Sequence, residues 1–80
     1  MGYVVVEIQK AQDGTLSLLS TAFNDPEKSD KQNRNEAESQ YHDVLHYAAV
    51  SDLPLHSATL LHDSGREIEH RSYDNQSQEV

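Results

Sequence analysis

The sequence lacks several features that would identify a chemistry. It contains no cysteine, so it can form neither a disulfide framework nor a thiolate metal site, which suits a reducing compartment. Its three glycines are spread along the chain and form no glycine-rich phosphate loop. No segment approaches the roughly 20 apolar residues that a membrane-spanning helix needs, and residues 1–10 lack the basic start and apolar run of a signal peptide. We therefore expect a cytoplasmic protein without a membrane partner.

Basic residues are also scarce. Six lysines and arginines stand against 14 aspartates and glutamates, which gives a formal net charge of −8. A protein that binds nucleic acid directly needs a basic surface to neutralise phosphates, so no direct nucleic-acid contact is expected. Two explanations of the acidity stay open: solubility, and attraction to a basic surface on another protein.

Apolar residues make up 35% of the 80 residues, which is low for a globular domain. A chain of this length forms one domain and buries only about 60–65% of the surface of its unfolded state. We expect this domain to span residues 1–73 and to include a polar loop at residues 24–34. Residues 74–80 are polar, and we expect them to be a disordered tail.

Residues 35–51 form the only long segment with helical periodicity. Apolar residues recur there at spacings of three, four, seven and eight, which is one stripe of a helix. They are Ala37, Tyr41, Val44, Leu45, Ala48 and Ala49. Asn35 and Glu38 have the spacing of a capping box at the start, and Pro54 cannot continue the helix at its end. Four of the apolar residues are expected to pack against a sheet: Tyr41, Val44, Leu45 and Ala48.

Four further segments have the alternation or the β-branched content of strands. They are residues 2–10, 15–23, 55–63 and 67–73. Turn signals at Asp13-Gly14 and at residues 63–66 join them into two hairpins. The order ββαββ predicts an α+β fold, in which a four-stranded antiparallel sheet of order 2-1-3-4 carries one helix on one face. The charged fourth strand suits a sheet edge.

The first three strands carry apolar residues on both sides, although one helix can cover only one face of a sheet. A sheet with one face in water should alternate more cleanly between apolar and polar residues. The second face is therefore either wet or covered by a partner. We expect a homodimer that forms through this face or through an exposed strand edge.

Five histidines raise the question of a metal site. His42 and His46 are four residues apart, which is a helical spacing for two ligands. A zinc site needs a third and a fourth ligand, and His56, His62 or His70 could supply one of them. The H-E-x-x-H motif is absent, because this segment reads HDVLH. We interpret these residues as exposed or packed histidines and expect no metal, no other cofactor and no enzyme. A histidine-based metal-binding protein stays as a lower alternative, and a pH-sensitive interface is a further role weighed for His56 and His62.

Four stretches of the sequence carry a resemblance to other proteins: YVVVEIQ near the start, QDGTL at 12–16, NEAESQYHDVLHYAAVSDLPLHSATLL at 35–61, and DSG at 63–65. Together they resemble a family of very small uncharacterised proteins from phages and mobile elements of gut Firmicutes. The resemblance covers residues 3–73 apart from the acidic loop, and it brings no catalytic residues with it. It implies a bacterial host cytoplasm and a non-enzymatic binding role. Proteins of similar size, charge and setting include anti-CRISPR proteins that block a basic nucleic-acid channel.

These observations predict a small acidic protein that binds another protein. The specific hypothesis is an inhibitor of a host nucleic-acid-guided defence complex, such as a CRISPR effector, that occupies its basic surface. The alternative is a homo-oligomeric accessory protein of a mobile element with no inhibitory role. The candidate partner-binding residues are acids of the loop, the outer helix and the fourth strand: Asp25, Glu27, Asp30, Glu36, Glu38, Asp43, Glu67 and Glu69.

Overall fold

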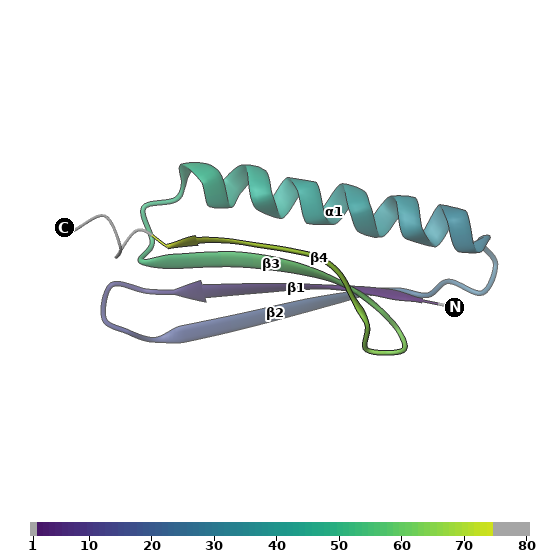
Figure 1. Ribbon diagram of the computed structural model, residues 1–80, viewed down its shortest axis with the longest axis horizontal. Coiled ribbons are helices and arrows are strands. Elements are labelled where there is room, and N and C mark those ends of the chain that lie inside the picture. The colour runs from purple at the N-terminus through teal and green to yellow at the C-terminus, as the bar shows by residue number, and fades with distance from the viewer. Residues whose placement is uncertain (1, 75–80) are drawn as a thin grey trace.

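The computed structural model describes residues 2–74, which form a four-stranded sheet with one long helix along it (Figure 1). In chain order the elements are β1 (Tyr3–Lys10), β2 (Leu16–Phe23), α1 (Asp30–Val50), β3 (Leu55–His62) and β4 (Glu67–Asp74). The sheet order is β2-β1-β3-β4, and all neighbouring strands are antiparallel. The predicted α+β fold, element order and sheet order are confirmed.

The apolar strand β1 lies between β2 and β3, so these two strands run in the same direction and α1 connects them across one face of the sheet (Figure 1). The two hairpin turns each contain a glycine in the left-handed region, with φ of 92° at Gly14 and 93° at Gly65. Other residues rarely adopt this conformation. The first hairpin closes with a hydrogen bond of 2.8 Å from the Ala11 N–H to the Thr15 carbonyl.

The helix begins earlier than its apolar pattern. The prediction of a loop at residues 24–34 is wrong for its last five residues, because α1 begins at Asp30. The capping box is formed by Ser29 and Gln32 instead of the predicted pair further along. The Ser29 hydroxyl accepts from the Gln32 N–H at 3.1 Å, and the Gln32 side chain accepts from the Ser29 N–H at 2.9 Å.

The apolar stripe is interrupted in the first turn of α1 because a polar residue, Asn33, occupies the core-facing position. Asn33 is 3% exposed. Its Nδ2 donates to the Asp25 carbonyl and its Oδ1 accepts from the Asp25 N–H, both at 3.1 Å. Because both polar atoms are satisfied, their burial costs little. The same two bonds attach the loop to the helix.

The core lies between α1 and one face of the sheet. It consists of side chains that are at most 4% exposed: Tyr3, Val5, Ala37, Tyr41, Val44, Ala48, Ala58 and Leu60. The predicted burial of Tyr41, Val44 and Ala48 is confirmed, whereas Leu45 is only partly buried. Leu45 lies on the flank of α1 that faces β4, where it borders a depression together with Glu69 and Arg71.

The other face of the sheet carries no helix or strand among residues 2–74 (Figure 1). Successive side chains of a strand point to opposite faces, so the neighbours of the buried residues Tyr3, Val5 and Leu60 point to this side. We call this side the open face, and its large apolar residues are Val4, Val6, Ile8, Leu16, Leu18, Leu55 and Leu61. Leu16 and Leu18 are each 64% exposed.

The last described residue, Asp74, belongs to β4 and not to the predicted tail. Residues 75–80, which make up the rest of that tail, lie outside the described residues. Within residues 2–74, no helix has the length and apolar content to cross a membrane.

Candidate interaction surfaces

The eight acidic residues predicted to bind a partner do not form one continuous surface. Glu36 and Glu38 are two residues apart on α1, so they point about 200° apart around the helix axis, to opposite flanks. Arg34 borders a depression together with Arg66 and Ile68, which places this flank of the helix beside β4. Glu38 lies one turn after Arg34 on the same flank, whereas Glu36 lies on the flank that Lys28 reaches.

The flank beside β4 carries charges of both signs. Its acids alternate with arginines: Glu38, Glu67 and Glu69 lie near Arg34, Arg66 and Arg71. Glu38 and Arg34 form an ion pair of 3.2 Å between exposed side chains, a kind of pair that contributes little to stability. Because acids and arginines balance here, this flank has no excess of negative charge.

The opposite flank of α1 and the loop before it do have an excess of acids. We call this region the acidic flank, and its acids are Asp25, Glu27, Glu36 and Asp43. Asp43 follows Glu36 by seven residues, which is two turns, so the two side chains lie on one side of the helix. Lys28 is the single basic residue among them, and the hydrogen bond that it donates to Glu36 raises the pKa of its amine.

An exposed aromatic residue extends the acidic flank along the helix. Tyr47 lies one turn after Asp43 on the same side and is 67% exposed. Tyrosine is enriched at protein interfaces because its ring provides a large contact area and its hydroxyl a polar group. The acidic flank thus combines negative charge with a candidate anchor for a partner.

Asp30, another of the predicted partner-binding residues, has a structural contact. Its Oδ1 accepts a hydrogen bond of 2.9 Å from the Tyr3 hydroxyl, which joins the start of α1 to the start of β1. Burial of the Tyr3 ring and its hydrogen bond to Asp30 together raise the pKa of the Tyr3 phenol.

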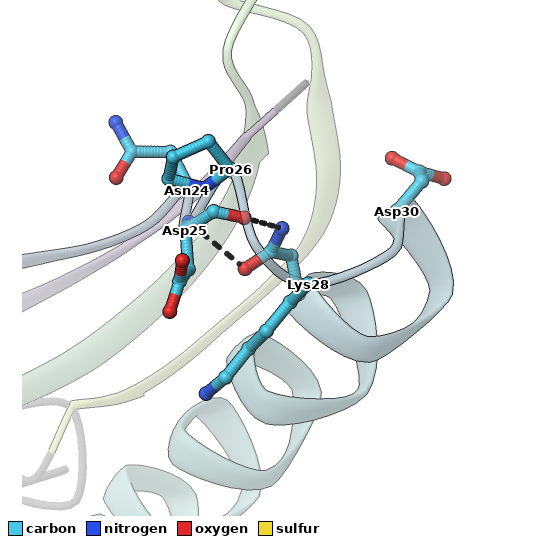
Figure 2. Close-up of a pocket in the computed structure, with 6 residues that line it drawn as sticks. Asn24, Asp25, Pro26, Lys28 and Asp30 are labelled. Atoms are coloured by element: carbon cyan, nitrogen blue, oxygen red, sulfur yellow. Dashed lines mark hydrogen bonds between the residues drawn. The ribbon is translucent and has the colours of Figure 1, made fainter.

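A pocket of about 400 Å³ lies where the loop meets the start of α1 (Figure 2). Its lining residues are Asn24, Asp25, Pro26, Lys28, Asp30 and Asn33. The amide of Asn33 is occupied by its two hydrogen bonds to Asp25, drawn as the dashed lines at Asp25 in Figure 2. The Lys28 side chain forms an ion pair with Glu36. These polar groups hold the loop in place, so we assign the pocket to the loop structure and not to a ligand.

The two helical histidines, which have the spacing of a metal pair, are both exposed. The His42 ring packs edge-on against Tyr41 with centroids 5.5 Å apart, and the His46 ring packs similarly against Tyr47 at 5.9 Å. Within the described part of the chain, no three histidine, aspartate or glutamate residues gather closely enough to hold a metal ion.

The strand histidines lie on both faces of the sheet. His56 and His62 share the helix-facing side, and His62 packs edge-on against Tyr3 at 5.5 Å. His70 of β4 lies across from Thr59, and its Nδ1 is 2.7 Å from the Thr59 hydroxyl. The strand histidines are thus engaged with neighbours in their own sheet.

A buried polar cluster lies under the C-terminal half of α1. His56 Nε2 is 2.6 Å from Glu7 Oε2, and Gln9 Nε2 donates to the same oxygen at 2.8 Å. The side chains of His56 and Glu7 are 5% and 16% exposed. Because an ionised carboxylate can only accept a hydrogen bond, the proton is assigned to His56 Nε2, which donates the hydrogen bond to Glu7. His56 Nδ1 is buried and has no hydrogen-bond partner among the described residues.

A carboxylate that orients an imidazole is also found beside catalytic bases. Catalysis would require the second ring nitrogen to reach a substrate. His56 Nδ1 is covered by protein atoms, so we interpret the cluster as a structural device that joins β1 to β3.

Sequence reasoning did not single out Glu7, Gln9 or Tyr47. The strand register contains the signal for the first two, since Gln9 lies directly opposite His56 and Glu7 is on the same face. The signal for Tyr47 is its spacing of four and eleven residues from Asp43 and Glu36, which places all three along one side of a helix.

Comparison of the chain with protein-family models, curated proteins and solved structures found no match. The resemblance to a family of phage and mobile-element proteins therefore stays a prediction, and function has to be argued from the residues.

Proposed function

We propose that this protein acts by binding another protein through the acidic flank, without catalysis, and that the partner presents a basic surface. The observation that supports this most directly is the grouping of four acids with one lysine on the loop and one side of α1. The chain carries a net charge of −8, but the flank beside β4 is balanced by arginines. The four acids and one lysine leave the acidic flank with a net negative charge, so of the two flanks of α1 it is the one that would attract a partner's Lys and Arg side chains.

The physical role of these acids is to steer association. Exposed charges act over about 10 Å at moderate salt and accelerate encounter more than they tighten a complex. Tyr47 supplies what the acids lack, because burying its exposed ring against a partner would provide apolar contact area.

The sharpest form of the proposal names the partner as a host nucleic-acid-guided defence complex, such as a CRISPR effector. The basic channel of such a complex binds phosphates, and an acidic protein surface competes for the same lysines and arginines. The support for this form is the charge of the acidic flank together with the resemblance to proteins from phages and mobile elements.

The test is a binding titration against a purified effector at two salt concentrations, with and without the DNA of its target. We expect salt and bound DNA each to weaken the association. The double variant Glu36→Lys with Asp43→Lys should slow association at least about tenfold at low salt.

The matched control is Glu67→Lys with Glu69→Lys, which makes the same change in net charge on the other flank. It should slow association much less. If both double variants slow association equally, net charge alone matters and the acidic flank is not the binding surface. This form of the proposal would be rejected if binding does not depend on salt or on bound DNA, or if the protein does not bind the effector at all.

A further inference from the structure

The two edge strands of the sheet differ in how they are protected. β4 carries Glu67, Glu69, Arg71 and Asp74, and its register with β3 shifts between Leu60 and Leu61. Charges and bulges of this kind prevent edge strands from pairing with other chains. β2 reads LSLLSTAF, with no charge and no proline, and pairs with β1 over eight residues without a shift. Seven of its eight residues are exposed.

The free edge of β2 presents a regular row of backbone groups. In an antiparallel ladder, hydrogen-bonded and non-hydrogen-bonded pairs alternate. The hydrogen bond from Ala11 to Thr15 makes that pair hydrogen-bonded, so the next pair, Lys10 with Leu16, is not. The backbone N–H and C=O groups of every second residue therefore point away from β1: Leu16, Leu18, Ser20 and Ala22.

We propose that two copies of this chain pair through their β2 strands in antiparallel orientation and form one continuous eight-stranded sheet. An antiparallel edge is complementary to a copy of itself under a two-fold axis. The register is also restricted, because residues whose backbone N–H and C=O groups point away from β1 must lie opposite such residues of the second copy. With the fullest overlap, Leu16 lies opposite Ala22 of the second copy, Leu18 opposite Ser20, and Leu19 opposite Leu19. This arrangement makes about eight new backbone hydrogen bonds.

Each chain has a net charge of −8, and the uncharged β2 is the edge strand that adds least to the repulsion between two copies. Two such chains repel each other, so they should meet where charge is absent, and β2 is uncharged while β4 is not. A basic partner would gain no electrostatic attraction from this edge. The dimer is argued from the backbone and composition of β2 alone, so it does not depend on the proposed function.

The first experiment uses the absence of cysteine. Leu19→Cys places one thiol at the two-fold axis, in a non-hydrogen-bonded pair with Cα atoms about 4.5 Å apart, which a disulfide can bridge. Mild oxidation should link two chains covalently within minutes. Leu18→Cys is the matched control, because the residue is similarly exposed but its two copies would lie about 8 Å apart. It should link at least ten times more slowly. Equal rates, or faster linkage through position 18, would overturn the proposal.

The second experiment measures the mass in solution by sedimentation equilibrium. The unmodified chain should approach twice its 9.0 kDa as concentration rises. Ser20→Pro removes an outward N–H that β1 does not use, so it should leave a folded monomer, with folding checked by circular dichroism. Thr59→Lys places a charge on the open face away from β2 and should leave the dimer intact. A monomer at all concentrations, or a dimer broken by Thr59→Lys but not by Ser20→Pro, would overturn pairing through β2.

Discussion

The two faces of the sheet are built from the same strands but bury their apolar residues to different degrees. Under α1, Val5 and Leu60 are 2% and 0% exposed, whereas on the open face Leu16 and Leu18 are each 64% exposed. β1 contributes valines to both faces, since Val5 points to the helix and its neighbours Val4 and Val6 point away. The faces therefore differ less in composition than in what covers them.

This difference separates residues that stabilise the fold from residues that are available for association. The free energy of burial is about 25 cal/mol per Å² of apolar surface removed from water. The residues under α1 gain most of it on folding, those of the open face in β1 and β3 gain part of it, and Leu16 and Leu18 of β2 gain little. Exposed apolar patches on small proteins commonly mark interaction sites, and the edge strand β2 lies at the border of this one.

The largest expected effect is the difference in unfolding free energy between the same substitution made on each of the two faces. Leu60→Ala should lower the free energy of unfolding by about 2–5 kcal/mol, because it leaves a cavity under α1. Leu16→Ala should cost about 0.5 kcal/mol or less, because the side chain is already in water. Urea denaturation at low protein concentration measures both. Equal costs would mean that the open face is covered in solution.

Much of the fold could be predicted from the sequence, because its signals are local. The Asp13-Gly14 turn, the alternation in the strands and the stop at Pro54 each depend on a few neighbouring residues. The start of α1 could not be predicted in this way. Its core-facing residue Asn33 is polar, and its burial depends on hydrogen bonds to Asp25, eight residues away.

The candidate surfaces were less predictable because they depend on distant placement. Glu36 and Glu38 are near in sequence but lie on opposite flanks of α1, and the arginines on the flank of Glu38 include Arg71 of β4, which is distant in the chain. The contact between Glu7 and His56 depends on the register of two strands that are 49 positions apart in the chain. Composition indicates acidity, but only the fold determines where acids are in excess.

A smaller difference in stability is expected when a polar pair is broken on each of the two faces. Glu7→Ala should cost about 1–3 kcal/mol, because it leaves the buried His56 Nε2 without its acceptor. Glu7→Gln retains an acceptor oxygen and should cost less. Thr59→Val removes an exposed hydrogen bond to His70 on the other side of the sheet and should change stability by about 0.5 kcal/mol or less. Thermal unfolding at pH 7 ranks the three variants. A Thr59→Val cost as large as that of Glu7→Ala would contradict the assignment of the two faces.

The smallest effect tests the helix-covered face by titration of Tyr3. Burial and the hydrogen bond to Asp30 raise the pKa of this phenol above its ordinary value of 10.0. The neutral phenol is therefore favoured in the folded chain, and its contribution to stability is fully present below pH 10. As the pH rises above 10, the unfolded chain ionises first, and the contribution is lost as the pH passes through the raised pKa.

The measurement is the stability difference between the unmodified protein and Tyr3→Phe, which has no hydroxyl to donate to Asp30. This difference should be constant from pH 7 to about pH 9 and should shrink above pH 10. Taking the difference cancels the titration of the lysines, because both proteins contain them. Tyr47→Phe is the matched control, since it removes the same atom from a side chain that is 67% exposed, and it should leave stability at pH 7 unchanged. If the Tyr3→Phe difference is independent of pH up to 11, Tyr3 does not lie buried against Asp30, and the packing of α1 on this face of the sheet would have to be revised.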